Sequence, residues 1–134
     1  MLVGVAALAG CTDDEPTAVA EEVGPAAVQL VSPEGAAEVI DANAANPELV
    51  IVDVRTPEEF AESRIEGAIN LDMQDPGFAA GLDALDRDAT YVVYCRSGNR
   101  AQAATAQMDQ AGFTTVYEIE GGIVAWTDAG LPVV

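Results

Sequence analysis

Cys95 and two nearby arginines form the part of this sequence best suited to chemistry. The stretch YVVYCRSGNRAQAA, residues 91–104, passes from an apolar run through Cys95 into small polar residues and then into a helix-forming segment. The chain has only five basic residues, all arginines, and a net charge of −18. Two of the five, Arg96 and Arg100, follow Cys95 closely, so positive charge is concentrated where a thiolate or an anionic substrate would need it.

The order strand, short loop, helix start predicts an anion cradle around Cys95. Backbone N–H groups in such a loop point inward, and the helix dipole favours negative charge at the same place. We therefore expect Cys95 to be a nucleophilic thiolate, and Gly98 is free to adopt a positive φ. The substrate would be bound by the loop residues Arg96, Ser97, Gly98, Asn99 and Arg100. The structural alternative is that Cys95 packs as a small buried hydrophobe.

The length of this loop favours one chemistry over another. Four residues separate Cys95 from Arg100, whereas the cradle of a cysteine phosphatase is one residue longer and accommodates a phosphate. The shorter loop suits one extra sulfur atom on the cysteine. A phosphatase or arsenate reductase remains a weaker alternative, since the sequence also lacks a histidine before the cysteine.

Composition excludes several classes of function. A net charge of −18 argues against binding to nucleic acid, which requires many basic residues. The absence of histidine and the presence of only two distant cysteines argue against a zinc site, and we expect neither a metal nor a cofactor. A length of 134 residues suits one domain, which we expect to be monomeric.

The segment from residue 28 onward alternates between β-branched runs and helical runs, which predicts a mainly parallel α/β sheet. We expect strands at 27–31, 49–54, 67–71, 90–95 and 114–119. Expected helices follow at 33–42, after Thr56, at 78–85, from Arg100 to the stop at Gly112, and at 121–130. Asp53 and Arg55 flank the end of the second strand, and Cys95 ends the fourth. Both sites therefore fall at the carboxyl edge, where open α/β sheets bind their ligands.

The first 27 residues predict export and attachment to a membrane. Residues 1–10 are apolar and too short to span a bilayer as a helix, and they are typical of a secretory signal. Leu8 to Cys11 resembles a bacterial lipobox, so we expect Cys11 to carry a lipid and to anchor an extracytoplasmic protein. Residues 11–27 would form an acidic, flexible tether. Residues 28–134 would form the folded domain.

Three segments of the chain together resemble the rhodanese-like domain family. They are IVDVRTPEEFAESRIEGAINL, YCRSGNRA and GGIVAWTDAGLPV, in the family's order, and the resemblance extends from about Val28 to Val134. Arg64 and Glu66 stand where many members have His and Pro. The resemblance implies a five-stranded, mainly parallel sheet and a sulfurtransferase activity. Cys95 would accept a sulfane sulfur from a donor such as thiosulfate, form a persulfide, and pass the sulfur to cyanide or a thiol.

The resemblance leaves some roles and one alternative function open. Asp53 and Arg55 match a family motif, and we expect them to give structural support by joining the strand to neighbouring loops. Gly121, Gly122 and Trp126 are interpreted as turn and core residues. The alternative to an enzyme is a non-catalytic binding or sulfur-carrier module tethered to the membrane, although the complete cysteine loop favours catalysis.

Overall fold

The structure, a computed structural model, describes residues 27–134. The predicted signal segment, Cys11 and nearly all of the predicted tether lie outside the described residues. Within the described part of the chain, no helix combines the length and the apolar character needed to cross a membrane.

Five parallel strands form one sheet in the order β1-β5-β4-β2-β3. The α/β fold class predicted from the sequence is confirmed. Because β4 and β5 lie in the middle of this sheet, the residues after them meet at its carboxyl edge. The strands are β1 (Val28–Val31), β2 (Leu49–Asp53), β3 (Ile69–Asn70), β4 (Thr90–Tyr94) and β5 (Thr115–Ile119).

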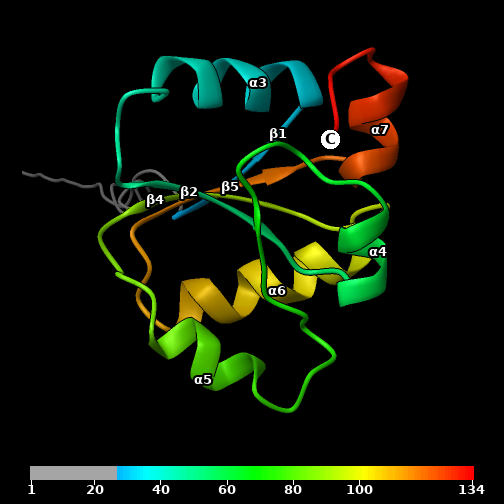
Figure 1. Cartoon of the computed structure of the whole chain (residues 1–134). Coiled ribbons are helices and arrows are strands. Elements are labelled where there is room, and N and C mark those ends of the chain that lie inside the picture. Colours follow the sequence, from blue (N-terminus) through cyan, green and yellow to red (C-terminus); the bar gives the residue numbers. More distant parts are fainter. Residues whose placement is uncertain (1–26) are drawn as a thin grey trace, which may run out of the picture.

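Helices cover both faces of the sheet (Figure 1). One face is covered by α3 (Pro33–Ala42) and α7 (Gly122–Asp128), and the other by α5 (Phe78–Asp83) and α6 (Asn99–Gln110). The short helix α4 (Pro57–Glu62) follows β2 and lies beside the carboxyl edge.

Two helices begin where local sequence signals place them. The Ser32 hydroxyl accepts a hydrogen bond from the Gly35 N–H at 3.0 Å, and Pro33 occupies the first helical position of α3. At α4 the Thr56 hydroxyl accepts from the Glu59 N–H, and the Glu59 carboxylate accepts from the Thr56 N–H. This reciprocal capping box fixes Glu59 at the start of α4.

The side chains of β4, and that of Cys95 directly after it, alternate between the two cores that these helices cover. Tyr91, Val93 and Cys95 belong to the core beneath α5 and α6, whereas Val92 and Tyr94 belong to the core beneath α3 and α7. This period of two is the ordinary geometry of a strand. It places the Cys95 side chain on the α6 side of the sheet.

Some predicted elements are shorter in the structure. Strand β3 contains two residues instead of the five predicted, because it lies at the sheet edge and pairs with β2 only through Val52 and Asp53. The predicted helix at 78–85 ends at Asp83. Helix α6 ends at Gln110, and Gly112 follows with a φ of 92°, as a helix-terminating glycine does.

Candidate active site

Cys95 follows the last residue of β4, and its thiol lies within the turn that leads into α6. The side chain is buried, with 1% of its surface exposed. The Gly98 N–H donates a hydrogen bond to Cys95 Sγ at 3.0 Å. Gly98 precedes the first turn of α6 and has a φ of 116°, a conformation that glycine adopts without the steric penalty of a Cβ. This hydrogen bond stabilises negative charge on the sulfur.

The start of α7 holds the cysteine loop in place through backbone hydrogen bonds. The N–H groups of Ile123 and Val124 donate to the carbonyl oxygens of Cys95 and Arg96, at 2.9 and 3.1 Å. Gly122 has a φ of 64°, and a Cβ there would overlap both of those carbonyl oxygens. The sequence analysis interpreted Gly121 and Gly122 only as a turn. In the structure Gly122 is what allows the two segments to approach so closely.

The two loop arginines differ in their surroundings. Arg100 donates from Nη1 and Nη2 to the two carboxylate oxygens of Glu59, at 2.7 and 3.1 Å. These hydrogen bonds lower the pKa of Glu59 to about 2 and raise the pKa of Arg100. Arg96 is exposed, and no hydrogen bond or ion pair of its side chain occurs among residues 27–134. Arg96 is therefore the loop cation that remains available to a solute.

Asp53 and Arg55 form a buried pair beside the loop. Their side chains are 0% and 4% exposed, with Arg55 Nη2 2.6 Å from Asp53 Oδ2. Arg55 also donates to the Ser63 carbonyl oxygen, and the Asn70 amide donates to the carbonyl oxygens of both Asp53 and Arg55. The pair thus connects β2 to the segments after α4 and around β3.

Tyr94 is the last residue of β4 and connects the segment around Ile65 to the start of the cysteine loop. Its hydroxyl accepts a hydrogen bond from the Ile65 N–H at 3.1 Å. The guanidinium carbon of Arg55 lies 5.7 Å from the centre of its ring. Burial raises the pKa of Tyr94, so the hydroxyl stays neutral and serves as a structural hydrogen-bonding group.

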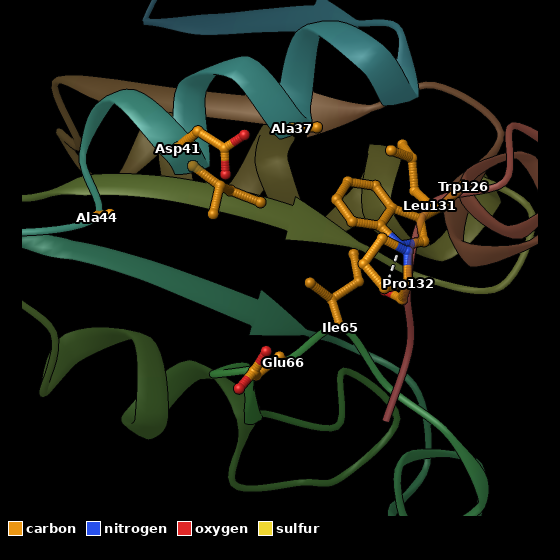
Figure 2. A pocket seen from close by; sticks show the side chains of 9 residues that line it. Ala37, Asp41, Ala44, Ile65, Glu66, Trp126, Leu131 and Pro132 are labelled. Carbon is orange, nitrogen blue, oxygen red and sulfur yellow. Dashed lines mark hydrogen bonds between the residues drawn. The ribbon is translucent and has the colours of Figure 1, made fainter.

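Two cavities lie near these residues, on opposite faces of the sheet. A cavity of about 350 Å³ lies on the α6 face beside the cysteine loop, and Ser97, Gly98 and Asn99 form part of its wall. A larger cavity of about 570 Å³ lies between α3, Trp126 and the segment around Ile65 (Figure 2). Trp126 also belongs to the core, and its indole N–H donates to the Pro132 carbonyl oxygen at 2.8 Å. Cys95 lines neither cavity, but residues of the cysteine loop form part of the wall of the smaller one, which is therefore the candidate substrate space.

Of the predicted loop residues, Gly98 contacts Cys95 Sγ through its N–H, and Arg100 is paired with Glu59. Arg96, Ser97 and Asn99 are exposed on the loop. Asp53 and Arg55 form a separate buried pair. The sequence analysis missed Glu59 as the partner of Arg100; the spacing of Thr56 and Glu59, which is that of a capping box, is the one local signal that could have pointed to it. Among the described residues, no group of three or more acidic, cysteine or histidine side chains is arranged to hold a metal ion.

Comparisons with known proteins agree with this architecture. A sulfurtransferase from Allochromatium vinosum is 38% identical over 87 residues, which cover 65% of this chain and 79% of that protein. A thiosulfate sulfurtransferase from Pseudomonas aeruginosa is 36% identical over 98 residues, covering 73% of this chain and 83% of that protein. The crystal structure of a rhodanese-related protein from Thermoplasma volcanium superposes with a TM-score of 0.66 at 29% identity. It covers 79% of this chain and 97% of that one.

A family model is the most direct of these comparisons. The model of the rhodanese-like domain matches residues 36–129, a range that extends from α3 to the residue after α7 and includes the whole cysteine loop. With the parallel sheet and the loop geometry described above, this match shows that the chain belongs to the rhodanese-like domain family.

Proposed function

We propose that this protein is a sulfurtransferase that carries a sulfane sulfur as a persulfide on Cys95. The observation that supports the proposal most is the hydrogen bond from the Gly98 N–H to Cys95 Sγ, at 3.0 Å, in a loop that begins a helix. The sulfurtransferase names of the relatives give independent support.

The first half-reaction follows from the chemistry of a thiolate and thiosulfate. The Cys95 thiolate attacks the outer, sulfane sulfur of thiosulfate and forms a new S–S bond. The bond between the two sulfur atoms of thiosulfate breaks, and sulfite leaves with the electron pair. The Gly98 N–H, and the helix start behind it, would stabilise the negative charge that remains on the persulfide. Arg96 would attract the thiosulfate dianion to a domain whose net charge otherwise repels it.

In the second half-reaction a nucleophilic acceptor, cyanide or a thiolate, attacks the outer sulfur of the persulfide. The persulfide bond breaks, and its electron pair returns to Cys95 Sγ as the thiolate. The Asp53–Arg55 pair and the start of α7 would keep the loop in place through both steps. No cofactor is required for this sequence of two displacements.

The production of thiocyanate from thiosulfate and cyanide tests the proposal. We expect turnover by the wild-type domain and none by the Cys95→Ser variant, because serine cannot form a persulfide. Hydrolysis of p-nitrophenyl phosphate without thiocyanate production would instead indicate a phosphatase. Absence of both activities in a folded wild-type protein would favour a binding module.

A further inference from the structure

A buried carboxylate lies one strand away from the nucleophile and takes no part in the chemistry proposed above. Glu118 of β5 is 7% exposed, and its Oε1 accepts a hydrogen bond from the Thr105 hydroxyl at 2.8 Å. Among the described residues 27–134, no donor reaches its second oxygen. Burying a carboxylate with an unpaired oxygen is unfavourable, so the second oxygen requires a partner from outside the protein.

Glu118 lines the cavity of about 350 Å³ beside the cysteine loop. Glu120, which is exposed, lines the same cavity two residues further along. The remaining wall comes from β1, the loop and the first turns of α6 and α7: Val28, Leu30, Ser97, Gly98, Asn99, Gln102 and Gly121. We call this space the loop cavity. Its two carboxylates make it acidic.

The sheet register places Glu118 close to the reacting sulfur. Val93 of β4 pairs with Glu118 of β5, and Cys95 lies two residues beyond Val93. With strands about 4.8 Å apart and a rise of about 3.3 Å per residue, the Cα atoms of Glu118 and Cys95 are about 8 Å apart. Gly98, whose N–H touches Sγ, is itself part of the cavity wall. Cys95 Sγ is buried and does not itself line the cavity, so a molecule bound there would have to meet the outer sulfur of a persulfide that extends from Sγ.

The protein supplies no positive charge to this cavity from its described residues. Arg55, Arg87 and Arg100 are each paired with an acidic side chain elsewhere. Arg64 donates to the Phe60 carbonyl oxygen, and Arg96 does not line the cavity. Glu118 therefore has no ion-pair partner among the described residues, and a cationic ligand in the cavity would supply one.

We propose that the loop cavity binds the sulfur acceptor and selects a thiol that also carries an ammonium group, that is, a small aminothiol. The inference rests on the proposed sulfurtransferase function and names the acceptor class for the same site. The ammonium group lies against Glu118 and Glu120. The acceptor thiolate attacks the outer sulfur of the Cys95 persulfide, the persulfide S–S bond breaks, and the electron pair returns to Sγ. The acceptor leaves as its own persulfide.

The test measures the second half-reaction alone. The protein is loaded with sulfur by thiosulfate, freed of excess reagent, and mixed with 2-aminoethanethiol, 2-mercaptoethanol or mercaptoacetate, which are cationic, neutral and anionic thiols of similar size. These thiols differ in intrinsic reactivity, so the quantity compared is the rate ratio of aminothiol to neutral thiol in each variant. Glu118→Gln keeps the shape of the side chain and the hydrogen bond from Thr105. We expect it to reduce that ratio about tenfold, through loss of a nearby charge.

Two further variants distinguish an effect of the loop cavity on the rate ratio from an effect of the overall negative charge of the domain. Glu38→Gln removes one carboxylate from the exposed side of α3 and should leave the ratio unchanged. Glu120→Gln, at an exposed position, should reduce the ratio by a smaller factor and replaces Glu118→Gln if that variant does not fold. Equal ratios in wild type, Glu118→Gln and Glu120→Gln would overturn the inference, as would an equal decrease in Glu38→Gln.

A binding measurement tests the cavity independently of turnover. The probe is 2-(methylthio)ethylamine, which carries the ammonium group but cannot accept sulfur. Titrated into the protein, it should shift the amide resonances of Gly98 and Glu118, and Glu118→Gln should weaken the binding. Binding without any sulfur loading of Cys95 would support the cation site and refute the proposed function. Sulfur loading with no binding of the probe would refute the cation site alone.

Discussion

Arg100 at the start of α6 donates two hydrogen bonds to the carboxylate of Glu59 at the start of α4, at 2.7 and 3.1 Å. A cation at a helix N-terminus is unfavourable because the helix dipole opposes it. The Glu59 carboxylate offsets this penalty, and it simultaneously completes the capping box of its own helix. One carboxylate thus fixes α4 against the end of the cysteine loop.

Replacing Glu59 by Gln should destabilise the fold without dismantling the cap. A glutamine oxygen can still accept from the Thr56 N–H, so the substitution removes mainly the charge that Arg100 requires. We expect a decrease of about 2 kcal/mol in the free energy of unfolding, measured with urea at pH 7. Glu58→Gln, in the same turn, is the control. A loss as large in the control would mean that helix charge, and not the pair with Arg100, is responsible.

The same substitution should change the pH dependence of stability. The pKa of Glu59 falls from an ordinary 4.5 to about 2 in the folded protein, so the folded state favours the ionised carboxylate. The resulting stabilisation is fully present above pH 4.5 and is lost as pH falls toward 2. The difference in unfolding free energy between wild type and Glu59→Gln should therefore shrink from pH 5 to pH 3. A constant difference over that range would contradict the assigned pKa.

Gly122→Ala should displace the cysteine loop. The added methyl group would overlap the carbonyl oxygens of Cys95 and Arg96, so the loop or α7 must move. We expect sulfur transfer to fall more than about tenfold, since small displacements of catalytic groups have large effects on rate. Gly130→Ala is the matched control. Its φ is also positive, at 81°, but a Cβ there meets nothing within 4 Å, so it should lose about 1 kcal/mol of stability from strain and keep its activity.

Substitutions of Arg96 and Arg100 should have different effects on the KM for thiosulfate and on stability. Arg96→Ala should raise KM for thiosulfate several-fold and leave the unfolding free energy nearly unchanged, because its side chain is exposed and unpaired within residues 27–134. Arg100→Ala should mainly reduce stability, since it leaves Glu59 without its partner.

Added salt screens charges beyond about 8 Å. The wild-type rate at low thiosulfate should fall with salt, and the rate of Arg96→Ala should stay flat or rise. Identical salt profiles would show that Arg96 does not steer the donor.

Local signals in the sequence were sufficient for most of the fold. Ser32-Pro33 and Thr56-Pro57 predict the starts of α3 and α4 correctly because a cap and a proline at the first position act within one turn. The uninterrupted apolar runs predict β2 and β4 because both faces of those strands are covered. The strand β3 was predicted too long, since its extent depends on pairing with β2 and not on its own residues.

The features that the sequence did not predict all depend on contacts between distant segments. Glu59 and Arg100 are 41 residues apart, and no periodic pattern connects them. Glycine is needed at position 122 because a Cβ there would overlap the carbonyl oxygens of Cys95 and Arg96. Helix α6 and strand β5 separate these two residues from Gly122 in the sequence. The sequence analysis did not single out Glu118, and only the register with β4 shows that it lies near Cys95.

Attachment to a membrane stays a prediction from the sequence. If Leu8 to Cys11 is a lipobox in the cell, Cys11→Ser should release the full-length protein from the membrane fraction and abolish labelling with a fatty-acid probe. Cys95→Ser serves as the control and should not change the labelling. Retention of the Cys11→Ser protein in membranes would show that the segment does not direct lipidation.

The mass of the intact domain after treatment with thiosulfate tests the central claim most directly. A Cys95 persulfide predicts a gain of one sulfur atom, localised to Cys95 by fragmentation. The gain should disappear on addition of cyanide as thiocyanate forms, and it should be absent in a folded Cys95→Ser variant. An unmodified Cys95 in the wild type, together with undiminished thiocyanate production by Cys95→Ser, would contradict the proposed mechanism.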